Sequence, residues 1–161
     1  MIREATPADF EAFAALEKEV QRMHFDARPD TFIEAPFDGD IAKYRADFEA
    51  SLQNECVKIF VYEENGDVLG YCKTEAWDYD QHPIYRDVVV LNISSIGVDE
   101  KARGRKIGTR LFNQAKAYAA EIGAARFMLS VSDFNKQAIK FYEQLGMTAQ
   151  TVTMEMTKNA D

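Results

Sequence analysis

The chain has 161 residues, 47% of them hydrophobic and 12% aromatic, so it can bury one substantial core and is too short for two. We therefore expect residues 1–161 to form a single domain. Its formal net charge of −8 argues against general nucleic-acid binding, which needs a basic face, and weakly favours cationic partners. No apolar run approaches the ~18 residues that cross a bilayer, and the N-terminus lacks a signal peptide. These features indicate a cytoplasmic protein that does not act at membranes.

The first third of the chain predicts a short strand followed by two helices. Residues 2–4 can form the strand, and Thr6 to Asp9 holds the capping residue, the proline and the acidic residue that open a helix. Apolar residues follow at helical spacing, and the helix should end near Arg28-Pro29, because the residue before a proline resists helical geometry. The sequence predicts a loop over 29–39 and a second helix over 40–54.

The remaining elements alternate between strands and helices. Strands are predicted at 57–62 and 67–77, joined by Asn65-Gly66, which is a strong hairpin signal. The later elements are a loop at 78–86, a mostly apolar strand at 88–98, a helix at 106–122, a strand at 126–132, a helix at 135–145 and a strand at 148–157. The β-α-β crossover between residues 88 and 132 predicts a mixed sheet with helices on both faces, in one α/β domain.

The two cysteines, Cys56 and Cys72, lie in or beside two predicted strands. Neither belongs to a C-x-x-C pattern, and the two histidines, His24 and His82, stand at spacings unrelated to a metal site. We expect two buried free thiols, with no disulfide and no metal.

A basic, glycine-containing loop precedes the helix at 106–122. It reads Arg103-Gly104-Arg105-Lys106-Ile107-Gly108. A helix N-terminus offers unpaired backbone N–H groups, glycines let a ligand approach the backbone, and the cations add positive charge to an acidic chain. These features suit a pyrophosphate, although a solvated basic turn would have the same composition. The loop is neither a P-loop nor a G-x-G-x-x-G dinucleotide motif.

A second motif starts the helix at 135–145. Asn135 stands at a predicted N-cap, and Tyr142 lies beside the apolar stripe of the helix. A single tyrosine in this position is more often a residue of the core or its boundary. Together the two segments, R-G-x-x-I-G and N-x-x-A-x-x-F-Y-x-x-L-G-M, resemble the GCN5-related N-acetyltransferase superfamily in motif, order and spacing over residues 88–147.

The resemblance implies a fold and a donor. The fold would have a mixed, mostly antiparallel sheet of 6–7 strands, splayed between the strand at 88–98 and the strand at 126–132. The donor would be acetyl-CoA, bound without a metal. The residues implied for its binding are Ile96, Gly97, Val98, Arg103, Gly104, Arg105, Lys106, Ile107, Gly108, Thr109, Asn135 and Tyr142.

Two positions depart from the family pattern. Lys106 stands where the family usually has a glycine, and Met147 replaces a phenylalanine.

The resemblance also implies catalytic roles. Tyr142 would be the general acid, since a phenol of pKa ~10 suits a leaving thiolate. The backbone N–H of Val98 is the implied donor to the oxyanion.

The general base is not evident from the sequence. An alkylamine of pKa ~10 is mostly protonated at pH 7, so a group must accept its proton. The position where family members that acetylate protein N-termini often carry a glutamate is Ser130. A water relay that touches Asn92, Ser94 or Ser130 could serve instead, and Glu75 and Asp78 are further candidates for the base.

The acceptor is also open. The family usually builds acceptor specificity from the first two helices and from the segment before the central strand, which implies His24, Phe32, Tyr44 and Trp77 as candidates for contact with the substrate. We expect an N-acetyltransferase acting on a primary amine of a small molecule or peptide. A protein N-terminal or lysine acetyltransferase, a non-catalytic CoA-binding sensor and a longer acyl donor are alternatives, and a homodimer is possible.

Overall fold

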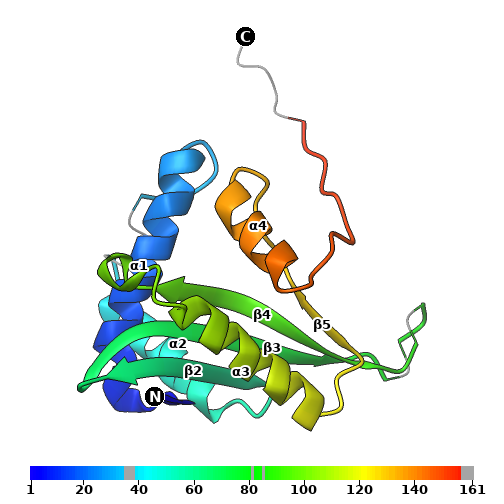
Figure 1. Ribbon diagram of the computed structural model, residues 1–161, viewed down its shortest axis with the longest axis horizontal. Helices are drawn as coiled ribbons and strands as arrows, with labels where there is room; N and C mark the ends of the chain where they lie inside the picture. Colours follow the sequence, from blue (N-terminus) through cyan, green and yellow to red (C-terminus); the bar gives the residue numbers. More distant parts are fainter. Residues whose placement is uncertain (35–38, 81, 85, 157–161) are drawn as a thin grey trace. The chain divides into compact units, whose positions relative to one another are not determined.

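A computed structural model describes residues 1–34, 39–80, 82–84 and 86–156. It falls into two compact units, Met1–Ser130 and Val131–Asp161. The first unit contains the sheet and three of the helices (Figure 1). The second contains the last helix.

The described residues form one five-stranded sheet, in the order β1-β2-β3-β4-β5. The pairs β1–β2, β2–β3 and β3–β4 are antiparallel, and β5 runs parallel to β4, so the predicted mixed, mostly antiparallel sheet is confirmed. The strands are β1 (Ile2–Glu4), β2 (Val57–Glu64), β3 (Asp67–Asp78), β4 (Val89–Val98) and β5 (Arg126–Leu129). The turn between β2 and β3 has Asn65 at φ 55° and Gly66 at φ 89°, as the hairpin signal predicts.

Helices cover both faces of this sheet. The helices α1 (Phe10–Ala27) and α2 (Ile41–Gln53) lie behind the sheet in Figure 1, and α3 (Ile107–Glu121) lies in front of it. Successive side chains of a strand point to opposite faces. Accordingly, Val61 and Tyr71 join the core cluster of α1 and α2, whereas Phe60 meets the ring of Tyr118 on α3 at 5.8 Å.

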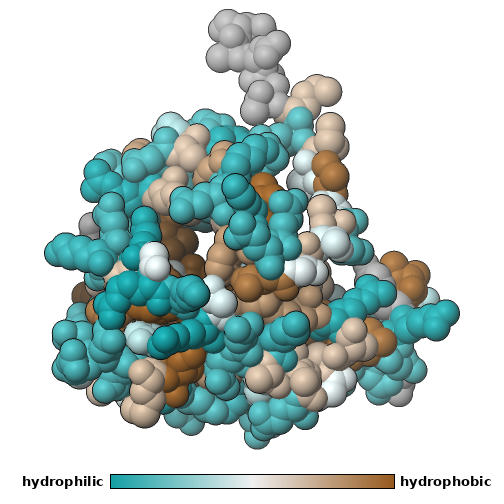
Figure 2. Space-filling view, viewed as in Figure 1, coloured by the Kyte–Doolittle hydropathy of each residue, from teal (hydrophilic) through white to brown (hydrophobic). Residues whose placement is uncertain are grey.

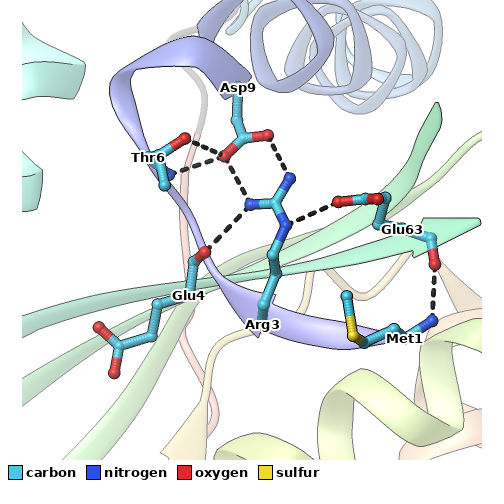
Figure 3. A network of polar contacts seen from close by, with 6 residues as sticks. All are labelled: Met1, Arg3, Glu4, Thr6, Asp9 and Glu63. Atoms are coloured by element: carbon cyan, nitrogen blue, oxygen red, sulfur yellow. Dashed lines mark hydrogen bonds and ion pairs between the residues drawn. The ribbon is translucent and has the colours of Figure 1, made fainter. Parts of the chain in front are cut away.

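A polar network ties the N-terminus to the sheet (Figure 3). Both terminal nitrogens of Arg3 donate to the carboxylate of Asp9 at 2.8 Å, and its Nε donates to Glu63 on β2 at 2.7 Å. The Asp9 carboxylate also accepts from the backbone N–H and the hydroxyl of Thr6. These bonds start a 3-10 turn (Pro7–Asp9) that leads into α1, which ends just before Arg28 as predicted.

The second unit holds α4 (Lys136–Gln144). The side chain of Asn135 caps this helix by accepting from the N–H of Ala138 at 3.0 Å, as predicted. Gly146, at φ 90°, follows the end of the helix.

Three expectations need correction. The expected 6–7 strands are five in the described part of the chain, because residues 148–156 form no strand there. That segment has the alternation of a strand, but Val152, Met154 and Met156 are exposed, and alternation without a neighbouring strand forms no ladder. The strand at 126–132 ends at Leu129, and Cys56 is exposed rather than buried.

Both cysteines are free thiols, and burial raises the pKa of Cys72 to about 12.

No helix in the described ranges is long and apolar enough to cross a membrane. The face of the molecule in Figure 2 is mostly hydrophilic, as the acidic composition suggests. The loop expected at 29–39 includes residues 35–38, which lie outside the described part.

Candidate active site

The β4 strand carries a bulge in its middle. Thr74 of β3 pairs with Ile93 and Lys73 pairs with Ser95, so Ser94 is an extra residue in β4. The parallel ladder between β4 and β5 stops at the same place, at Ile93 and Leu129. Because a bulge bends and twists its strand, the two strands part beyond Ile93, where the splay is predicted.

The part of β4 beyond the bulge therefore has a free edge. The N–H of Asp99 donates to the carbonyl of Leu69 on the β3 side. Hydrogen-bonded pairs alternate with non-bonded pairs along an antiparallel ladder. The backbone N–H and C=O groups of Gly97 therefore point toward β3, and those of Ile96 and Val98 point away from it. In the described residues the backbone N–H groups of Ile96 and Val98 have no acceptor, whereas the carbonyl of Val98 accepts from Arg103. Such an edge can pair with the amides of an extended ligand.

Close packing explains why position 97 is a glycine. A Cβ placed on Gly97 would come within 2.6 Å of the Tyr71 ring and 3.1 Å of a Val20 methyl group. The glycine therefore lets Tyr71 reach the core beneath this edge.

The loop after β4 presents a row of backbone donors. Across the described chain, the N–H groups of residues 104–109 find no acceptor, and the first helical bond of α3 runs from Arg110 to Lys106. Gly104 has a φ of 79°, which a glycine adopts without strain. A positive helix end with such donors suits a phosphate or pyrophosphate, so these residues fit the diphosphate of CoA.

Lys106 adopts the left-handed conformation, with φ 62° and ψ 19°, at the N-cap of α3. This is the conformation for which a glycine is suited, and for an L-residue it costs about 1–2 kcal/mol. Lys106 thus keeps the backbone geometry that the family usually obtains with glycine.

The arginines of the loop are engaged by carboxylates. Arg103 pairs with Glu19 of α1 at 3.5 Å, and Glu19 also accepts from the N–H of Glu100. Arg105 pairs with Glu64 at the end of β2. In the described ranges, Lys106 has no ion-pair partner, so its exposed ammonium remains available to an anion.

A pocket of about 270 Å³ lies between the two N-terminal helices and the bulge of β4. Its polar lining comes from Glu17 on α1, Tyr44, Asp47 and Ser51 on α2, Lys73 on β3, and Ser94 and Ser95 on β4. The hydroxyls of Tyr71 and Ser95 lie 2.6 Å apart at this place. Burial, and then the charge of Glu17, raise the pKa of Tyr71 well above its usual value, so its phenol stays protonated.

The base candidates from the sequence are only partly brought together. Asn92 and Glu75 are cross-strand partners on β4 and β3, and Asn92 is buried. Neither lines the pocket among the described residues. Ser130 is exposed after the end of β5.

The acceptor candidates lie in different places of the first unit. Tyr44 lines the pocket, and its pKa is raised by burial and by the charge of Glu17. His24 packs against Phe32 with ring centroids 4.9 Å apart, and burial lowers its pKa. Trp77 stands opposite Val90 near the far end of β3.

Asn135 and Tyr142 belong to the second unit. Tyr142 is half-buried on α4 and meets the ring of Phe141 edge-on at 5.2 Å. Its carbonyl accepts from Met147, which closes the helix.

Glu17 is the residue that sequence reasoning missed. It occupies the stripe of α1 that carries Phe10, Phe13 and Val20, and only 8% of it is exposed. The signal in the sequence was a carboxylate on an apolar helix face, because charged residues are rarely buried without a partner that balances the charge.

Comparison with known proteins finds relatives that are named acetyltransferases. The uncharacterized N-acetyltransferase YhfO of Bacillus subtilis is 28% identical over 93% of this chain and 91% of its own length. Mycothiol acetyltransferase of Sanguibacter keddieii is 30% identical over 62% of this chain, but over only 30% of its own length.

Solved structures agree with the fold. The tetramutant of BH1408 from Bacillus halodurans is 30% identical and superimposes with a TM-score of 0.89, covering 98% of this chain and 99% of that one. The aminoglycoside N-acetyltransferase AAC(6')-Iy in complex with CoA has a TM-score of 0.72 at 17% identity, over 99% of this chain and 100% of that one, and is alike in fold alone. The family model described as "Acetyltransferase (GNAT) family" matches residues 12–147. Because this match takes in most of the chain, the protein belongs to the GNAT family of acetyltransferases.

Proposed function

We propose that the protein transfers the acetyl group of acetyl-CoA to a primary amine of a small molecule or peptide, by direct attack on the thioester and in the cytoplasm. GNAT acetyltransferases are acyltransferases that use acetyl-CoA as co-substrate. The observation that carries the proposal is the row of unpaired backbone N–H groups at residues 104–109, next to the free edge of β4. The names of relatives support nitrogen as the accepting atom.

The proposed donor contacts follow from this geometry. The diphosphate of CoA would accept from the N–H groups of residues 104–109, and its pantetheine amides would pair with the edge at Ile96 and Val98. The cationic side chains of the loop add positive charge. Among the described residues, Lys106 contributes most, because carboxylates pair with Arg103 and Arg105. Asn135 would contact the same arm.

The proposed chemistry is one displacement. The amine nitrogen attacks the thioester carbonyl carbon, and the oxygen gains negative charge that the N–H of Val98 would stabilise. The C–S bond then breaks, and the phenol of Tyr142 would protonate the departing sulfur.

Two measurements test this function. Calorimetry should detect acetyl-CoA binding, and a panel of small amines, lysine peptides and free peptide N-termini should reveal thiol release with at least one class. The class that reacts separates a small-molecule enzyme from a protein acetyltransferase. Binding of acetyl-CoA without thiol release from any acceptor would instead identify a CoA-binding sensor, and longer acyl-CoA donors test the choice of acyl group.

A further inference from the structure

Glu17 on α1 is a carboxylate that the donor site does not use. Its carboxylate lines the pocket beside the β4 bulge and is more than nine-tenths buried. No ion pair involves Glu17 anywhere in the described ranges. The neutral hydroxyl of Tyr71 hydrogen-bonds Glu17, but no cation among the described residues balances its charge. A cationic ligand would supply that missing charge.

The groups around Glu17 favour a cation over an anion. A second carboxylate in the pocket is Asp47, which also pairs with Lys43 at 2.8 Å. The one ammonium in the lining belongs to Lys73, which donates to the hydroxyl of Ser51 at 3.1 Å. Phe13 and Phe48 form the apolar part of the wall, and the faces of aromatic rings attract ammonium groups.

The titratable groups that face Glu17 come from every element packed against it. They are His24 on its own helix, Tyr44 and Asp47 on α2, and Tyr71 and Lys73 on β3. Burial keeps His24 and both tyrosines neutral near pH 7. Glu17 is therefore the most deeply buried group in this pocket that can accept a proton and carry a charge.

We propose that Glu17 receives the acceptor as a primary ammonium ion in this pocket and takes its proton before the attack. The inference rests on the proposed function and adds the base and the acceptor class, a cationic aminoalkyl group. The location is suitable, because Ser94 and Ser95 join the pocket to the part of β4 where the free edge begins.

The proton and electron pairs balance in this step. Glu17 accepts one proton from the ammonium, and the freed lone pair of nitrogen forms the bond to the acetyl carbon. The sulfur leaves with the C–S electron pair and takes the proton of Tyr142, and the second amine proton passes to solvent. Glu17 then releases its proton and Tyr142 regains one, so both groups return to their starting states. The sum is one ammonium and one thioester giving one amide, one thiol and one proton.

The decisive experiment compares the pH profiles of Glu17→Gln and the wild type with the best acceptor from the panel. At pH 7 the variant should lose about 100-fold in kcat/KM, the usual contribution of a general base. The loss should shrink as the pH approaches the amine pKa of ~10, because the neutral amine then needs no base. The Kd for acetyl-CoA should be unchanged, and Glu49→Gln, an exposed carboxylate on α2, should behave as the wild type.

Other outcomes would contradict the inference. An unchanged rate, or the same loss at every pH, would leave Glu17 a structural residue. If Glu17→Gln melts early, Glu17→Asp replaces it. This variant keeps the carboxylate, so its pH profile should have the shape of the wild-type profile at a lower rate. A profile that follows the ionisation of the amine, unlike that of the wild type, would overturn the assignment. An acceptor analogue with an amine of low pKa should react nearly as well with Glu17→Gln as with the wild type. Absence of thiol release from the wild type with every amine would instead refute the proposed function itself.

Discussion

The two sides of the proposed active site are built in different ways. The donor side, residues 96–109, is one continuous segment that offers mainly backbone groups: a strand edge, a left-handed N-cap and a helix N-terminus. The acceptor pocket draws side chains from α1, α2, β3 and β4, which are distant in the chain. Backbone sites tolerate many substitutions, whereas a pocket of side chains changes its ligand with single substitutions. We therefore expect single substitutions to change the acceptor more readily than the donor.

Tyr142→Phe removes the phenolic proton proposed for the leaving thiolate. We expect kcat to fall by about 100-fold or more, because general acids typically contribute at least that much. Steady-state thiol release measured from pH 6 to 9 checks this, with acetyl-CoA affinity as control. Full activity across that range would show that the thiolate leaves without Tyr142.

Gly97→Ala is expected to distort the strand edge on the donor side without changing any charged group. The new methyl group would meet the Tyr71 ring at 2.6 Å, so the strand edge or the ring must move. We expect a loss of about 3 kcal/mol in the free energy of unfolding, and weaker acetyl-CoA binding. Urea unfolding and calorimetry measure the two effects. A variant as stable as the wild type would mean that the core beneath the edge adapts easily.

Asp9→Asn is expected to lower stability and leave both sides of the site intact. The hydrogen bond from Arg3 is the largest cause that lowers the Asp9 pKa to about 2, against the opposing effect of burial. A lowered pKa stabilises the fold above the unfolded value near 4, and this contribution is lost as the pH falls toward 2.

The free energy of unfolding of Asp9→Asn should therefore be about 2 kcal/mol below that of the wild type at pH 7. The difference should shrink between pH 4 and about 2, where the wild-type carboxylate becomes protonated. Denaturant titrations over this pH range measure it, and a difference that does not change with pH would exclude the ionic explanation.

Lys106 allows strain and charge to be separated on the donor side. Lys106→Gly removes both the left-handed strain and the ammonium, whereas Lys106→Ala removes only the ammonium. We expect the glycine variant to be more stable than the alanine variant by about 1 kcal/mol. Both should bind acetyl-CoA a little more weakly, and increasing salt should reduce that deficit. Equal stability of the two variants would show that the left-handed backbone is not strained in this loop.

Most of the fold followed from local patterns. The capping residues at Thr6 and Asp9, the Asn65-Gly66 turn and the helical stripes predicted elements that the structure contains, because each pattern acts over a few residues. The strand expected at 148–157 shows the limit, since Val152 and Met154 alternate as in a strand but have no neighbouring strand in the described residues. The sequence of a segment shows that it can form a strand, but it does not show whether a neighbouring strand is available for pairing.

The sequence by itself determined the segment proposed as the donor side, because its loop, strand edge and helix start are neighbours in the chain and depend on backbone geometry. Only the tertiary structure decided the acceptor pocket. The bulge at Ser94 sets which residues of β3 and β4 stand together, and packing of α1 against the sheet buries Glu17 beside Ser95 and Tyr71. Such contacts depend on strand register and helix packing, which arise from the whole hydrophobic core rather than from any local segment.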